Sequence, residues 1–259
     1  WAFQAFKFLI VAWITMLAMT AKLGQTLTQM SWVPGDSSLV GLAQLSGEGN
    51  PARLSAAVTA VFRVYLTLAT AGACIVFAVN GGFVSAWVGS GRFAGPVVNG
   101  MLASMVVVGS VVHGLATISS VLGRRLQVGL ATLLSGLVQL TLAFVLGRRF
   151  GLMGVPLAAI CAQGLVLIPM LLPSLKDRAG VGTRHLLRDV FRPWAGRSLP
   201  VIAVCAVAGP ALNALPFWIV IPIGGVIGLA YVWVARGLIL DYAPVADLLR
   251  KRVARFPAA

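Results

Sequence analysis

The sequence is poor in charged side chains and in the residue types that most enzymes use. Asp, Glu, Lys and Arg make up 10% of 259 residues, six residues are Asp or Glu, and two are His. No cluster of metal-ligand residues, no serine elbow and no glycine-rich phosphate loop occurs. Cys74, Cys161 and Cys205 lack a CxxC pairing and lie in apolar runs, where free cysteine packs as a small hydrophobe. The sequence therefore predicts a protein that is not an enzyme and has no metal and no cofactor.

Apolar residues, in contrast, are abundant and continuous. They make up 59% of the chain, and the mean hydropathy is +0.95. A water-soluble core of this size could not hide so much apolar surface, whereas helices of about 18 to 25 apolar residues suit a bilayer. The sequence predicts an all-α, polytopic transmembrane bundle of about seven spanning helices, with the lipid bilayer as its first partner.

The clearest spans form a hairpin in the middle of the chain. Leu126–Leu146 is uncharged and about 21 residues long, which is enough to cross a hydrocarbon layer of about 30 Å. A turn containing Gly151 follows, and Val155–Leu172 supplies a second apolar run. The remaining expected spans are Ala52–Val79, closed by Gly81-Gly82, then Val97–Leu122, and a last hairpin of Leu199–Leu212 and Phe217–Val234. Residues 1–34 fit either one long kinked helix or the end of one span followed by another.

Most basic residues fall between the spans. The net charge is +14, but the pattern is that of positive loops orienting a membrane protein and not of a nucleic-acid surface. The predicted organisation is 1–175 with about five spans, 176–198 as a basic cytoplasmic loop with an amphipathic surface helix, 199–240 with the last two spans, and 241–259 as a basic cytoplasmic tail. The turn with Arg148 and Arg149 lies on the other side and is an exception to the bias.

Two groups of short motifs resemble a known transporter family. One is Gly151-Leu-Met-Gly-Val-Pro-Leu-Ala-Ala-Ile160 with Leu165-Val-Leu-Ile-Pro-Met-Leu-Leu-Pro-Ser174, and the other is Leu17-Ala-Met-Thr-Ala-Lys-Leu with Gly41-Leu-Ala-Gln-Leu-Ser-Gly-Glu-Gly-Asn-Pro-Ala-Arg-Leu54. They resemble the later helices of polysaccharide flippases in the MOP superfamily, relatives of MATE exporters. The resemblance implies a MATE-like C-terminal lobe in a bacterial inner membrane, moving an undecaprenyl-pyrophosphate-linked oligosaccharide for cell-surface polysaccharide synthesis. Because the chain begins at Trp1 inside an apolar stretch, we expect it to be the C-terminal half of a longer transporter, with the missing N-terminal helices as partners.

Four polar residues on two adjacent predicted helices fit such a substrate. Lys22 and Arg63 would hold the pyrophosphate, and Gln25 and Gln29 lie on the helix face of Lys22 at i+3 and i+7. The alternative for Lys22 and Arg63 is that each extends to the membrane surface.

His113 and Asp36 are the other ionisable candidates within or beside spans. His113 either lines the transport path or makes a hydrogen bond between helices. Asp36 follows Pro34-Gly35 and either couples transport to an ion at a helix break or caps the next helix. A MATE-like cation- or proton-coupled antiporter and a non-transport membrane subunit of an envelope pathway remain the alternative functions.

Overall fold

The computed structural model is an all-α bundle, and it describes residues 2–213 and 215–240, with side chains described outside 2–10, 90, 217, 239 and 240. The predicted tail 241–259 lies outside the described residues. The long helices are α1 (Ala2–Asp36), α3 (Pro51–Val88), α4 (Pro96–Val121), α5 (Arg125–Phe150), α9 (Arg192–Leu212) and α10 (Phe217–Leu240). The shorter ones are α2 (Leu39–Gly47), α6 (Gly154–Ala162), α7 (Ile168–Ala179) and α8 (Thr183–Leu186). Single turns are η1 (Ser90–Arg92), η2 (Gly151–Met153) and two π-helical turns, η3 (Gln163–Leu167) and η4 (Leu187–Phe191).

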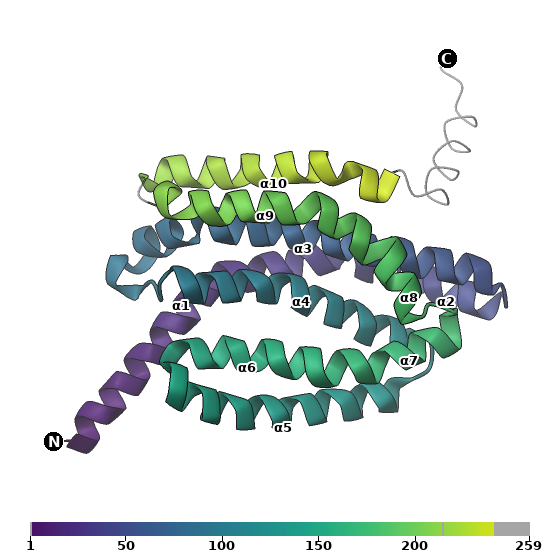
Figure 1. Ribbon diagram of the computed structural model, residues 1–259, viewed down its shortest axis with the longest axis horizontal. Coiled ribbons are helices and arrows are strands. Elements are labelled where there is room, and N and C mark those ends of the chain that lie inside the picture. Colours follow the sequence, from purple (N-terminus) through teal and green to yellow (C-terminus); the bar gives the residue numbers. More distant parts are fainter. Residues whose placement is uncertain (1, 214, 241–259) are drawn as a thin grey trace, which may run out of the picture.

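Five segments of the described chain are long and apolar enough to cross a membrane: Pro51–Val88, Pro96–Val121, Arg125–Ala179, Thr183–Leu212 and Trp218–Leu238. The 55-residue segment Arg125–Ala179 folds back on itself at Gly151, whose φ of +57° suits glycine. Its two arms, α5 and α6–α7, lie side by side as the predicted hairpin (Figure 1). The predicted final hairpin is also present, because α9 ends at Leu212 and α10 begins at Phe217. Residues 2–34 belong to one helix, α1, so of the two alternatives the structure shows the single helix.

Helix α3 is the centre of the bundle. Figure 1 shows α9 and α10 on one side of it and α1 and α4 on another, while the α5–α6 pair lies beyond α4. The largest buried cluster joins α3 and α4 to α7 and to the helix that begins at α8. Its biggest side chains are Phe62, Tyr65, Leu66, Leu115, Ile118, Leu171 and Leu175.

The prediction that Gly81-Gly82 closes a span is wrong, because α3 runs on to Val88. Both glycines are buried contact points for the α9–α10 turn. The side-chain oxygen of Asn213 accepts a 2.9 Å hydrogen bond from the Gly82 N–H, and a Cβ on Gly81 would lie 2.8 Å from Cγ of Asn213. Small residues here let another segment approach closely, as is usual between membrane helices.

Gly224 and Gly228 of α10 serve the same purpose against α3. A Cβ added at Gly228 would lie 2.9 Å from Ile75, and one added at Gly224 would lie 3.2 Å from Val79. The absence of side chains at these two positions is therefore what lets α10 lie close to α3.

The structure also differs from the predicted surface helix in 176–198. Only residues 180–182 form a loop, and Gly180 adopts the left-handed conformation that ends α7. Thr183–Leu212 is then one continuous helical segment. Leu186 and Val190 are buried in the main cluster, so the apolar side of this basic segment packs on the bundle.

Positive charge gathers at one end of the bundle. Figure 1 places α2, α8 and the α4–α5 turn at that end. The basic residues in or next to these segments are Arg53, Arg124, Arg125, Lys176, Arg178, Arg184 and Arg188. At the opposite turns, η1 and η2, the described basic residues are Arg92, Arg148 and Arg149.

The contact between α3 and α9 can be tested with the native cysteines. Cys74 and Cys205 are buried in one apolar cluster, where α3 packs on α9. We expect copper phenanthroline to oxidise this pair to an intramolecular disulfide, detected as a linked peptide by mass spectrometry. Cys161→Ser should keep the link and Cys205→Ser should abolish it. A disulfide that instead joins Cys74 to Cys161 would contradict this packing.

Candidate functional site: an amide-lined cavity beside an ionisable pair

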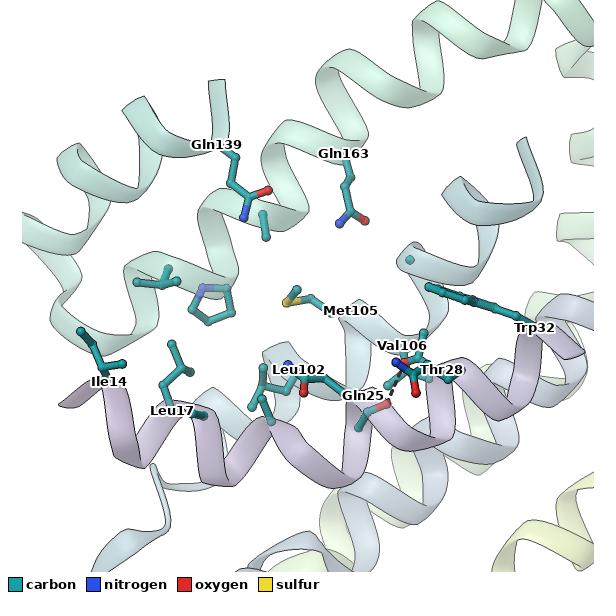
Figure 2. Close-up of a pocket in the computed structure, with 18 residues that line it drawn as sticks. Ile14, Leu17, Gln25, Thr28, Trp32, Leu102, Met105, Val106, Gln139 and Gln163 are labelled. Atoms are coloured by element: carbon teal, nitrogen blue, oxygen red, sulfur yellow. Dashed lines mark hydrogen bonds between the residues drawn. The ribbon is translucent and has the colours of Figure 1, made fainter. Parts of the chain in front are cut away.

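An open cavity of about 480 Å³ lies between α1, α4, α5 and the α6–η3 segment (Figure 2). Its wall is largely apolar, with Ile14, Leu17 and Leu102 at one part of it. The polar side chains that line it are Gln25, Thr28, Gln29, Gln139 and Gln163. No lining residue is charged, so the cavity suits a neutral, hydrogen-bonding group more than an ion.

The polar wall on α1 follows from helical spacing. Gln25, Thr28, Gln29 and Trp32 are three or four residues apart, so they share one face of the helix. The Thr28 hydroxyl donates to the Gly24 carbonyl at 2.7 Å, which ties it to its own helix. The two glutamines are exposed on this open face. The face of α1 that carries Gln25 and Gln29 forms a wall of the cavity, whereas Lys22, which was predicted to share that face, does not line it.

The opposite wall contains two glutamines that were not predicted. Figure 2 shows Gln139 of α5 and Gln163 across the cavity from Gln25. Gln163 begins the π-helical turn η3, and its Oε1 atom is buried without a hydrogen-bond partner in the described part of the chain. A buried carbonyl oxygen without a partner costs about 1–3 kcal/mol, and π turns inside helices are common at functional sites. The sequence signal for both residues is an amide within an otherwise apolar span.

A cluster of ionisable and aromatic side chains lies where α1 ends. One carboxylate oxygen of Asp36 accepts hydrogen bonds from the Tyr65 hydroxyl, at 2.8 Å, and from the ring of His113, at 2.9 Å. The indole of Trp32 stacks on the His113 ring, with centroids 3.9 Å apart and planes 2° apart. Three helices, α1, α3 and α4, thus meet at one carboxylate.

Further hydrogen bonds fix this cluster. Trp32 Nε1 donates to the Ser110 hydroxyl at 3.2 Å, and Ser110 lies 3.1 Å from the hydroxyl of Ser31. Ser110 also donates to the carbonyl of Val106, which lines the cavity. Trp32 therefore contacts His113 while forming part of the cavity wall.

These contacts bear on the alternatives given above, which are a transport path or an interhelical hydrogen bond for His113 and ion coupling or a helix cap for Asp36. His113 does make a hydrogen bond between helices. Asp36 does not cap the next helix, because the residue that precedes α2 is Ser38 and its side chain makes no capping hydrogen bond. The carboxylate of Asp36 points to Tyr65 and His113 instead.

The predicted cationic pair of Lys22 and Arg63 is not formed. Gly24, two residues beyond Lys22, faces Val76 of α3, which is 13 residues from Arg63 and so about 20 Å away along the helix. Lys22 is exposed and does not line the cavity.

Arg63 lies on another face of α3. Its guanidinium donates to the backbone carbonyl of Asp189 at 2.9 Å and to that of Leu238 at 3.0 Å. The neighbour that a side chain of α3 meets depends on which helices pack around α3. Spacing along the sequence does not show which helices these are.

Comparison with known proteins does not extend this description: no family model matches the chain, and neither a curated protein nor a solved structure matches it significantly. The fold and the composition together define the class, an all-α, multi-pass membrane protein.

Proposed function

We propose that the chain is part of a membrane transporter that flips an undecaprenyl-pyrophosphate-linked oligosaccharide across the bacterial inner membrane. The observation that carries the proposal is the uncharged cavity lined by Gln25, Gln29, Gln139 and Gln163. A primary amide both donates and accepts hydrogen bonds, which matches the hydroxyl groups of a sugar without the desolvation of a charge. Trp32 adds an aromatic surface at the side of the cavity nearest His113.

The size of the cavity limits how much of that substrate it would hold. About 480 Å³ is typical of a small-ligand pocket and accommodates a short segment of glycan. Since no basic residue lines it, the pyrophosphate would lie outside this cavity. The cavity is open, so it would face the N-terminal helices that the family resemblance implies.

The charge distribution supports an orientation. The end with Arg53, Arg124 and Arg125 would be cytoplasmic by the positive-inside rule, together with the C-terminus. This bundle and the N-terminal bundle would then rock against each other and expose the cavity to each side of the membrane in turn, as in transporters with a central site.

A small-molecule antiporter is the second candidate, because the cavity has the volume and the apolar walls of a drug-sized site. Reconstitution of the full-length protein in proteoliposomes separates the two. Flipping of a labelled polyprenyl-pyrophosphate oligosaccharide supports the first, and export of small cations against a proton gradient with no lipid flipping supports the second.

Gln163 gives the sharper test of the cavity. We expect Gln163→Met, of similar volume, to raise the melting temperature of the substrate-free protein by about 2–4 °C for each kcal/mol gained. It removes a buried carbonyl that has no partner among the described residues. The same change should lower the flipping rate by about tenfold, since one substrate hydrogen bond of about 1.4 kcal/mol is lost.

Gln127→Met is the matched control. Gln127 lies on α5 outside the cavity and donates to the Met170 carbonyl at 2.6 Å. Its replacement should lower the melting temperature and leave the flipping rate per folded molecule unchanged. If Gln163→Met transports at the parent rate, the cavity is not on the substrate path.

A further inference from the structure

The Asp36–His113 pair and the cavity share one side chain. One face of the Trp32 indole lies flat on the His113 ring. Trp32 also lines the cavity (Figure 2). A change of charge at His113 is therefore felt by a residue of the cavity wall through direct contact.

The hydrogen bonds define where a proton would bind. The carboxylate of Asp36 accepts, so the ring nitrogen Nε2 of His113, 2.9 Å away, carries a hydrogen in the neutral ring. Within the described part of the chain no hydrogen bond involves the other nitrogen, Nδ1. Uptake of one proton from water at Nδ1 converts the ring to imidazolium and takes the net charge of the pair from −1 to 0.

The surroundings favour a proton over a metal cation. The bonded oxygen of Asp36 is already shared by two donors, Tyr65 and His113, and one carboxylate does not make a coordination shell for Na⁺. The side chains of His113 and Asp36 are 22% and 39% exposed, so the protein itself encloses neither of them fully.

Tyr65 is the titratable neighbour that bonds to the pair, and several charged groups on the packed helices are bonded elsewhere. On α3, Tyr65 faces the pair and Arg63 is bonded to the Asp189 and Leu238 carbonyls. Glu48, beyond the end of α2, pairs with Arg53 at the start of α3. Asp177 of α7 pairs with Arg124.

We propose that Asp36 and His113 form a proton-binding site coupled to the cavity by Trp32. Imidazolium under an indole gains a cation–π attraction that the neutral ring lacks, so proton uptake holds Trp32 more firmly in its present place. Ligand binding beside Trp32 and proton binding at His113 then change each other's affinity by the same factor. The link to transport rests on the function proposed above, whereas the proton site and its contact with Trp32 do not.

Tryptophan fluorescence of the full-length protein in nanodiscs tests the site without any substrate. An imidazolium in contact with indole quenches its emission, so we expect the emission to fall when the protein is acidified and His113 takes up a proton. Both Trp32→Phe and His113→Gln should abolish this transition. Asp36→Asn should also alter this transition, because the carboxylate that accepts the hydrogen bond from the His113 ring is gone.

Trp87→Phe is the control, since Trp87 is half exposed near the end of α3, where it packs with Phe83. It should lower the total emission and keep the transition. A transition that persists in His113→Gln, or that is absent from the parent, overturns the proposal. If the transition behaves as expected and the protein flips no oligosaccharide lipid, the proton site stands and the flippase function falls.

Discussion

Gly209→Val is expected to lower the melting temperature by about 5–10 °C, because overpacking a close contact costs about 1–3 kcal/mol and more when backbone must move. Gly209 is buried on α9, where a Cβ would lie 2.4 Å from the backbone oxygen of Phe77 on α3. No side-chain rotation relieves a clash with a backbone atom, so α9 must move away from α3. Cys74 and Cys205 would move apart with it, which gives a second readout.

Gly196→Val is the matched control on the same helix. Gly196 is exposed, and a Cβ there would meet nothing within 4 Å. Both changes place the same β-branched residue in α9, so any loss from helix propensity is shared. Melting curves from detergent-solubilised protein should separate the two variants, and equal melting temperatures would show that α9 does not pack on α3 through Gly209.

How well the sequence predicts the structure of a segment depends on whether lipid or another part of the protein surrounds it. Long apolar runs such as Leu126–Leu146 predict helices well, since a bilayer forces every backbone group into an internal hydrogen bond. Gly81-Gly82 misled because glycine ends helices in water, whereas in this bundle it makes room for Asn213. A helix packed on a neighbour through small residues cannot be told from a helix stop without knowing that neighbour.

The candidate site shows the same division. Polar residues inside apolar runs, such as Gln25, Asp36 and His113, could be selected from sequence because they are costly there unless they are used. Their partners could not be selected, because the hydrogen bond between Asp36 and His113 joins residues 77 positions apart. Gln139 and Gln163 follow from the same rule applied to amides as well as to charges.

Arg63 gives the second large effect, and it separates a structural role from a substrate role. Arg63→Met keeps an unbranched, flexible side chain and removes the donors to the Asp189 and Leu238 carbonyls. A hydrogen bond to a charged group is worth about 1.5–3 kcal/mol, so the loss of two is about 3–6 kcal/mol before solvent screening of this half-buried group reduces it. The expected result is a lower melting temperature and faster proteolysis in the segment of η4, which Arg63 joins to α3 and α10.

Arg63→Lys is the informative comparison, because it keeps the positive charge and loses the planar fork that reaches two carbonyls at once. If Arg63 held a phosphate, lysine would restore most of the transport rate per folded molecule and methionine would not. If Arg63 ties helices together, both variants lose stability, and the molecules that remain folded transport at similar rates. The bonds to Asp189 and Leu238 favour the second result, and a transport defect in Arg63→Met with an unchanged melting temperature would contradict it.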